Sequence, residues 1–121
     1  MKIAVPKELY EGENRVGITP DCISALKKMG FEIYVESNAG LLSSFTNDEY
    51  KKNGAKISLN VKDLYNKADL VVKIQRPSKQ KKVNELNLLK NCNLLTLLYE
   101  QKFKTEFNQL KSLKVNVFAL E

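Results

Sequence analysis

The sequence predicts an α/β fold with an open, mostly parallel sheet and helices on both faces. Residues 1–36 follow the pattern strand, helix, strand, which is typical of a βαβ unit whose two strands pair in parallel. Two later runs, Leu70–Ile74 and Leu94–Tyr99, are almost continuously apolar. Such runs are typical of parallel strands that are covered on both faces. A length of 121 residues favours a single domain.

The first strand is short and leads into a long charged loop. Ile3 to Val5 are apolar, and Pro6 ends the strand before a loop that runs to Ile18. The loop carries Arg15, one of two arginines in the chain. Open α/β sheets bind ligands in the loops that leave the carboxyl ends of their strands. Arg15 is therefore a candidate for binding a carboxylate or a phosphate.

A helix and a second strand follow this loop. Thr19 is a suitable N-cap and Pro20 suits the first helical position. The buried face of the helix is predicted from residues spaced i, i+3, i+4 and i+7, namely Cys22, Ala25, Leu26 and Met29. Gly30 ends the helix, and the alternation of apolar and polar residues over 31–36 predicts the second strand.

Shorter elements are predicted in the middle of the chain. Thr46 and Glu49 have the spacing of a capping box, which begins a short helix that stops at Gly54. Residues 55–59 predict a third strand, and Asn60 caps the helix that precedes the strand at 70–74. A lysine-rich loop then follows, with Lys79, Lys81 and Lys82.

The last third of the chain predicts two more helix–strand steps. A weak helical turn is indicated by Val83, Leu86 and Leu89, and one face of an amphipathic helix by Phe103, Phe107 and Leu110. Residues 115–120 predict a final strand. The sequence stops at Glu121 without a helix to cover that strand, so we expect an incomplete domain.

Composition excludes several classes of function. The chain has no histidine, and Cys22 and Cys92 lie seventy residues apart, so we expect no metal site and interpret both cysteines as buried small hydrophobes. The net charge of +6 comes from scattered lysines without clustered aromatics, which argues against nucleic-acid binding. No apolar run approaches the roughly 18 residues that cross a membrane, and no signal peptide is evident, which predicts a cytoplasmic chain.

Four residues are expected to line a cleft between domains, because all follow predicted strands or lie in the loops beside them: Arg15, Gln75, Arg76 and Tyr99. Each has a structural alternative. Arg15 could pair with one of the nearby carboxylates, Glu8, Glu11 or Glu13. The corner at residues 75–77 could be a simple turn, and Tyr99 could serve packing. The five glycines, at 12, 17, 30, 40 and 54, do not form the GxGxxG fingerprint. We therefore assign no catalytic and no cofactor-binding residue.

Three segments carry a resemblance to a known family: KIAVPKE…EGENRVGITP (residues 2–20), GFEIYVESNAG (30–40) and KIQRP (73–77). They resemble the N-terminal domain shared by alanine dehydrogenase and the alpha subunit of the proton-translocating NAD(P) transhydrogenase. The resemblance covers essentially all 121 residues in unbroken order, and RVGITP and VESNAG are specific to this superfamily. It implies a flavodoxin- or Rossmann-like sheet.

Two positions separate the members of this superfamily. Alanine dehydrogenases carry a lysine where this chain has Gln75 and a histidine where it has Tyr99. Together with the arginine that matches Arg15, those residues hold and protonate pyruvate in the dehydrogenase. The resemblance therefore favours a transhydrogenase alpha subunit. An alanine dehydrogenase-like domain and a non-catalytic, self-associating interaction fragment remain as alternatives.

The resemblance to transhydrogenases implies hydride transfer between NAD(H) and NADP(H), coupled to proton translocation. In that family NAD is bound by later segments, and the N-terminal domain is completed by a segment that returns from beyond the NAD-binding domain. We therefore expect residues 1–121 to be inactive alone. The implied partners are the remaining alpha-subunit segments and an NADP-binding beta subunit, with a homodimer of the alpha component. The implied location is the cytoplasmic side of the inner membrane, through the rest of the complex.

Overall fold

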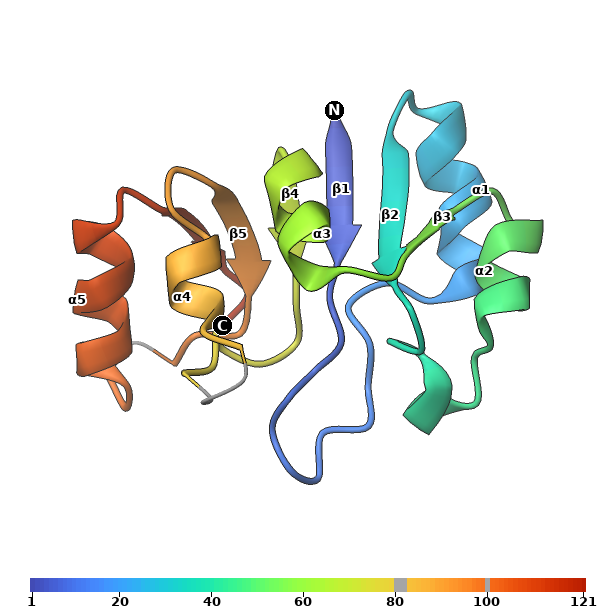
Figure 1. Cartoon of the computed structure of the whole chain (residues 1–121). Coiled ribbons are helices and arrows are strands. Elements are labelled where there is room, and N and C mark those ends of the chain that lie inside the picture. The colour runs from blue at the N-terminus through green and yellow to red at the C-terminus, as the bar shows by residue number, and fades with distance from the viewer. Residues whose placement is uncertain (80–82, 100) are drawn as a thin grey trace.

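A six-stranded parallel sheet forms the centre of the molecule (Figure 1). The computed structural model describes residues 1–79, 83–99 and 101–121. The strands are β1 (Lys2–Val5), β2 (Glu32–Glu36), β3 (Lys56–Ser58), β4 (Leu70–Val72), β5 (Asn93–Thr96) and β6 (Asn116–Ala119). Their order is β3-β2-β1-β4-β5-β6, and every pair is parallel. This is the order of a doubly wound, Rossmann-like sheet, so the predicted fold class is confirmed.

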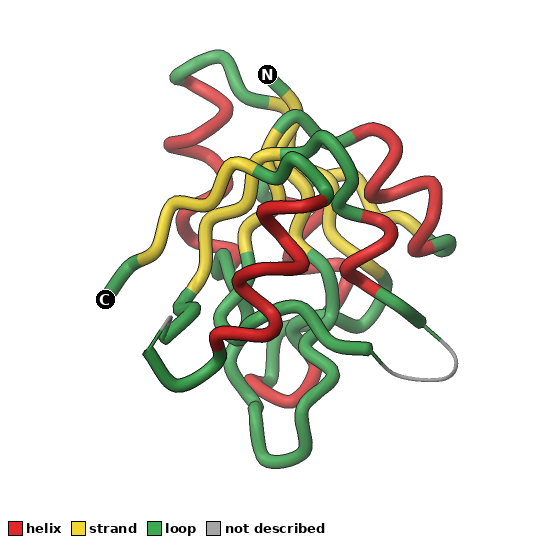
Figure 2. The backbone as a smooth tube through the Cα atoms, turned by 90° about the vertical axis from the view of Figure 1, so that its left-hand side faces the viewer, coloured by secondary structure: helices red, strands yellow, loops and turns green. Residues whose placement is uncertain are grey.

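Helices cover both faces of the sheet, as predicted (Figure 2). The helices are α1 (Pro20–Lys28), α2 (Asn47–Lys52), α3 (Val61–Lys67), α4 (Glu85–Leu88) and α5 (Lys104–Ser112), with a short 3-10 turn, η1 (Leu41–Ser43). α1 and α2 pack on one face and α3, α4 and α5 on the other. Two helices thus cover the first face beside β1, β2 and β3, whereas the part of that face formed by β4, β5 and β6 has no helix among the described residues.

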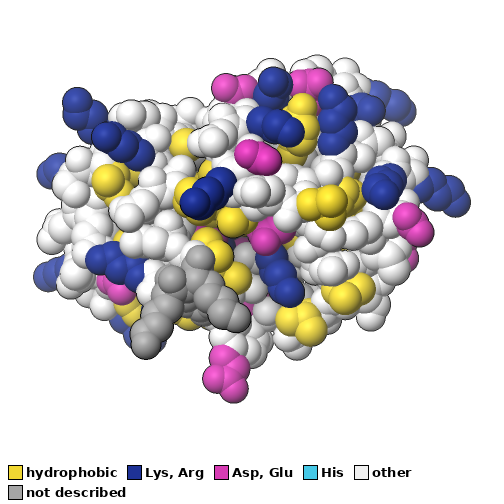
Figure 3. All heavy atoms as spheres, in the orientation of Figure 1, with side chains coloured by type: hydrophobic (Ala, Val, Ile, Leu, Met, Phe, Trp, Pro, Cys, Tyr) yellow, Lys and Arg dark blue, Asp and Glu magenta, His cyan; other side chains and the backbone are white. Residues whose placement is uncertain are grey.

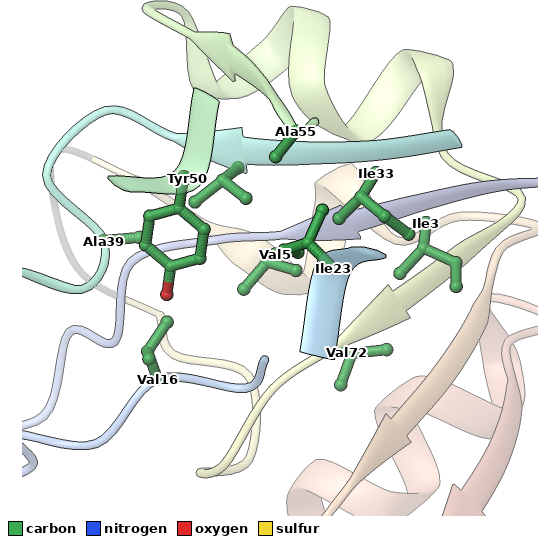
Figure 4. Packing of buried hydrophobic residues seen from close by; sticks show 10 residues of the cluster. Ile3, Val5, Val16, Ile23, Ile33, Ala39, Tyr50, Ala55 and Val72 are labelled. Atoms are coloured by element: carbon green, nitrogen blue, oxygen red, sulfur yellow. The ribbon is translucent and has the colours of Figure 1, made fainter. Parts of the chain in front are cut away.

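The two faces have separate hydrophobic cores because successive side chains of a strand point in opposite directions. Ile3 and Val5 of β1 enter the core under α1 and α2, and Ala4 between them enters the core under α3, α4 and α5. Figure 4 shows the first of these cores, in which Ile23 of α1 and Tyr50 of α2 lie over Ile3, Val5 and the other strands' side chains.

Helix caps agree in position with the sequence patterns. Thr46 accepts a hydrogen bond from the Glu49 N–H at 3.2 Å, and Asn60 accepts from the Lys62 N–H at 2.9 Å. Both bonds satisfy amide groups that the first helical turn leaves without partners. Thr19 occupies the N-cap position of α1, but its hydroxyl bonds to the Asp21 side chain instead of a backbone amide.

The predicted buried face of α1 is wrong. Ile23 is fully buried, whereas Cys22 and Ala25 are exposed and Met29 is 71% exposed. The physical reason is that α1 lies over β2 and beside α2, so Ile23 points into the sheet. The stripe through Cys22, Ala25 and Leu26 faces the part of the sheet without a helix. The prediction of a buried cysteine is consequently wrong for Cys22, and Cys92 is half-buried.

The later strands are shorter than predicted. β4 ends at Val72 and β5 at Thr96, because the following residues turn into loops at the carboxyl edge of the sheet. The predicted turn near Leu86 is α4, whose N-cap is Asn84. Lys79 is exposed, and the predicted loop positions Lys81 and Lys82 lie outside the described residues.

The basic residues do not form a patch on the face drawn in Figure 3, where lysine and arginine side chains are spread among acidic and uncharged ones. The described residues include no helix that is long and apolar enough to cross a membrane.

We predict that Ile23→Ala lowers the free energy of unfolding by about 2–4 kcal/mol, because it leaves a cavity between α1 and the sheet. Cys22→Ala is the matched control on the same helical turn and should change that free energy by less than about 0.5 kcal/mol. Urea denaturation followed by circular dichroism measures both. Equal losses in the two variants would contradict the placement of α1.

Candidate functional site

The loops that follow β1 and β4 meet at the carboxyl edge of the sheet, where the strand order reverses. Gly17 lies against β4 so closely that an added Cβ would stand 2.5 Å from the Val72 carbonyl oxygen, so no other residue fits there. The buried Tyr50 hydroxyl donates to the Ile18 carbonyl at 2.7 Å and fixes the end of the same loop. Burial raises the pKa of Tyr50 to about 12, so its hydroxyl stays a donor.

Glu8 joins the two loops. One carboxylate oxygen accepts the Gln75 N–H at 2.7 Å, and the other accepts the Ile74 N–H at 3.3 Å. These bonds satisfy backbone donors that follow the end of β4 and lack a strand partner. The position of the Gln75 corner therefore depends on a residue more than sixty positions earlier in the chain.

A buried ion cluster lies beneath this corner. Lys73 Nζ is 3.2 Å from Glu8 Oε2 and 3.3 Å from Glu85 Oε2, and all three side chains are at most 1% exposed. Glu85 also accepts from the Tyr65 hydroxyl at 2.7 Å and from the Ser78 N–H at 2.9 Å. Burial and the nearby Glu85 carboxylate raise the pKa of Tyr65 well above its usual value. Several bonds to each carboxylate compensate for the cost of removing these charges from water.

Glu13 holds Arg15 and Gln75 together. Arg15 donates to the two oxygens of this carboxylate through Nε and Nη2, both at 2.8 Å, and Gln75 donates through its side-chain amide at 2.7 Å. The bonds from Arg15, and to a smaller extent the bond from Gln75, lower the pKa of Glu13 to about 2 against the opposing effect of burial. The ion-pair alternative for Arg15 is confirmed, with Glu13 as the partner.

Arg76 belongs to a different group of residues. Its guanidinium carbon lies 4.4 Å from the ring centre of Tyr10 and 3.5 Å from that of Phe103. Its Nε is 4.0 Å from a Glu106 carboxylate oxygen and is a buried polar atom without a hydrogen-bond partner within the described part of the chain. Arg76 thus links the loop after β1 to the start of α5, and the sequence neighbours Gln75 and Arg76 serve separate contacts.

Tyr99 is 46% exposed, so the packing alternative for this residue is wrong. Its φ of 52° is left-handed, which is uncommon outside glycine, and its N–H donates to a Glu121 carboxylate oxygen at 2.6 Å. Tyr99 borders an open pocket of about 600 Å³ with Phe107 and Val117 among its lining residues. It is close enough to Arg15 to add to the raised pKa of that guanidinium, which Glu13 chiefly causes.

The structure therefore brings Arg15 and Gln75 together around Glu13, with Tyr99 at electrostatic range and Arg76 in its own aromatic sandwich. The amide of Gln75 is neutral, and the chain has no imidazole to transfer a proton at this edge. The described ranges contain no cluster of three or more Cys, Asp or Glu side chains that could hold a metal ion.

A long apolar groove lies on the other side of the loop, between α1 and the strands β1, β4 and β5. Its volume is about 730 Å³, and its lining includes Cys22, Ala25, Leu26, Leu70 and Leu95. The groove coincides with the half-face that has no helix among the residues described. Exposed apolar surfaces of this kind mark contacts with other protein segments.

The match to a known family model is nearly complete. The model described as "Alanine dehydrogenase/PNT, N-terminal domain" matches residues 4–121. The chain belongs to this family. Its relatives include both branches. It is 35% identical, over its whole length and 32% of the relative, to the first of the chains that make up the NAD(P) transhydrogenase alpha subunit of Rhodospirillum rubrum.

Alanine dehydrogenases are similar over shorter stretches. That of Methanococcus maripaludis is 38% identical over 78% of this chain and 24% of its own length. Alanine dehydrogenase 1 of Staphylococcus aureus is 46% identical over 64% of this chain and 20% of its own length. The chain therefore spans a third or less of the curated relatives it matches.

Solved structures confirm the fold. An L-alanine dehydrogenase superposes with a TM-score of 0.90 at 29% identity, and a transhydrogenase from Sinorhizobium meliloti with 0.88 at 26% identity. Each match covers 98% of this chain, and 32% and 34% of the respective structures.

The sequence patterns do not reveal the buried ion cluster. They place Lys73 in an apolar strand and Glu85 beside a weak helical turn, with no link between the two. A lysine inside an otherwise apolar run is itself a signal, because a buried ammonium requires an acidic partner. The sequence alone could have indicated that a carboxylate meets Lys73, but not which one.

We predict that Lys73→Met lowers the free energy of unfolding at pH 7 by about 3–5 kcal/mol, because two buried carboxylates lose their cation. Lys56→Met is the matched control, since its pair with Glu32 is exposed and should matter by less than about 1 kcal/mol. Urea denaturation measures both values. A loss near that of the control would show that the cluster is dispensable.

We predict that Arg15→Gln raises the pKa of Glu13 from about 2 toward its ordinary value of 4.5. A carboxyl whose pKa is lowered by folding stabilises the folded state above the unfolded pKa, and this contribution is lost as the pH falls through the folded pKa. The variant should therefore be less stable at neutral pH and begin acid unfolding at a higher pH than the parent.

Carbon-detected NMR of Glu13 measures the pKa, and circular dichroism follows acid unfolding. Lys28→Gln, a change of equal charge on the exposed side of α1, is the control and should leave both unchanged. A Glu13 pKa that stays near 2 in Arg15→Gln would refute the role assigned to this ion pair.

Proposed function

We propose that residues 1–121 are the N-terminal domain of a transhydrogenase alpha component, which takes part in hydride transfer between NAD(H) and NADP(H) coupled to proton translocation. One observation carries the proposal: beside Arg15 stands the neutral amide of Gln75, and both side chains are bound to Glu13. The resemblance implies a lysine at this position in an alanine dehydrogenase.

The chemistry of a 2-oxo acid needs more than this edge offers. Binding pyruvate for reduction calls for cations facing its carboxylate and carbonyl, and for an acid that protonates the new hydroxyl. Arg15 is already bound in a bidentate pair with Glu13, Gln75 carries no charge, and a phenol stands at Tyr99. This site supports a positioning role for the loops better than a catalytic one.

NAD is held, in this proposal, by segments outside residues 1–121. The chain spans about a third of its transhydrogenase relative and has no glycine-rich phosphate turn. The apolar groove beside α1 and the pocket at Tyr99 are the surfaces against which the remaining alpha-subunit segments pack. The further partners are an NADP-binding beta subunit and a second alpha component. The complex places the domain on the cytoplasmic side of the inner membrane.

An alanine dehydrogenase-like domain is the second candidate. The 46% identity to the Staphylococcus aureus enzyme over 77 residues favours it. Gln75 and Tyr99 count against it, because the resemblance implies charged and imidazole side chains at those two positions.

Two chimeras distinguish the candidates. In the first, residues 1–121 replace the matching segment of the Rhodospirillum rubrum subunit; in the second, they replace the matching segment of the Staphylococcus aureus enzyme. We predict that the first transfers hydride between NAD(H) and NADP(H) when combined with its partner subunits. The second should oxidise alanine at least about 100-fold more slowly than its parent, because the acid–base group is missing.

The control is the second chimera with Gln75→Lys and Tyr99→His, which should regain alanine oxidation and thereby show that the graft folds. Alanine oxidation at the parental rate by the unsubstituted second chimera would overturn the proposal. So would a folded first chimera that transfers no hydride.

A further inference from the structure

The outer edge of β6 has free backbone positions. β6 is the last strand of the sheet, and its inner side bonds to β5 through the Asn116 N–H to Cys92 O at 3.1 Å and the Leu120 N–H to Thr96 O at 3.0 Å. The backbone groups of alternate strand residues point to opposite sides. The N–H and C=O groups of Val117 and Ala119 therefore point away from the sheet. Figure 2 looks onto this side, with β6 at the margin of the sheet.

β6 lacks the devices that usually protect a sheet edge. Its four residues, Asn116–Ala119, include no charged side chain and no proline. Phe118 is 57% exposed and the adjoining Leu120 is 61% exposed. The opposite edge is protected, because β3 has only three residues and begins with Lys56, which is exposed and paired with Glu32. Long, uncharged edges are templates for another strand.

We propose that β6 is a self-association edge, at which the β6 strand of a second copy of this chain adds in the antiparallel direction. A two-fold axis at Phe118 places Val117 opposite Ala119 of the second copy, and each such pair exchanges two N–H···O=C bonds. The two Phe118 side chains face each other at the axis, where opposed residues of a non-hydrogen-bonded pair come closest.

The charge of the chain favours this edge over other surfaces for a second copy. Each copy carries a net charge of +6, so most faces repel their counterparts. Along β6 the two-fold pairing opposes only uncharged residues, and no like charges meet. Phe118 lines a small apolar pocket of about 370 Å³ with Leu70 and Leu95, so pairing at the axis also covers apolar surface next to the half-face without a helix.

The test is sedimentation equilibrium of the 121-residue chain over a wide concentration range without nucleotide, so the result is independent of the proposed function. We expect a reversible monomer–dimer equilibrium. Ala119→Pro removes one outward N–H from each copy and should raise the dimer dissociation constant at least about tenfold. Proline is tolerated on edge strands, and circular dichroism confirms the fold. Ala119→Ser keeps the N–H and is the matched control, with an unchanged constant.

Hydrogen exchange gives a second readout. The amides of Val117 and Ala119 should be protected at high concentration and exchange freely at low concentration, whereas those of Asn116 and Leu120 should be protected at both, because they bond to β5. A chain that stays monomeric at every concentration would overturn the proposal. A dimer that is unaffected by Ala119→Pro, with no concentration-dependent protection at Val117, would also overturn it by placing the contact elsewhere.

Discussion

The Glu8 carboxylate is the interaction on which the carboxyl edge of the sheet depends. It accepts two consecutive backbone N–H groups after β4 and also contacts buried Lys73. Through Lys73 the contact extends to Glu85 at the start of α4. Three segments that are distant in the sequence are thereby held at one point, where the strand order reverses. The position of Gln75 is a consequence of this network, since its backbone is fixed from below.

A rigid edge of this kind suits a domain that presents surfaces to other segments. The charged groups above the sheet neutralise one another: Glu13 takes both Arg15 and Gln75, and Arg76 lies between two aromatic rings. The apolar surfaces lie beside them, along α1 and at Tyr99. The arrangement joins a fixed polar edge to open apolar faces, which is the property expected of one section of a larger, multi-domain protein.

The fold is predictable from the sequence because the signals for it are local. Apolar runs, alternation and caps such as Asn60 depend on neighbouring residues, and they place every element to within a few positions. The face of α1 is predicted wrongly because periodicity marks an apolar stripe without saying what covers it. The stripe through Cys22 faces the open groove, and Ile23 carries the packing. The Lys73 cluster and the Glu13 hub are out of reach of sequence patterns, since they join residues some sixty positions apart.

The central claim is that residues 1–121 support hydride transfer without holding a dinucleotide themselves. Calorimetric titration of the 121-residue chain with NADH tests it most directly. The account predicts no saturable heat from the chain alone, and binding only when the segments that follow in its longer relatives are supplied. Saturable binding by the chain alone, at a dissociation constant near about 1 μM and lost in Arg15→Gln, would contradict the account and place the nucleotide at the Arg15 and Gln75 loops.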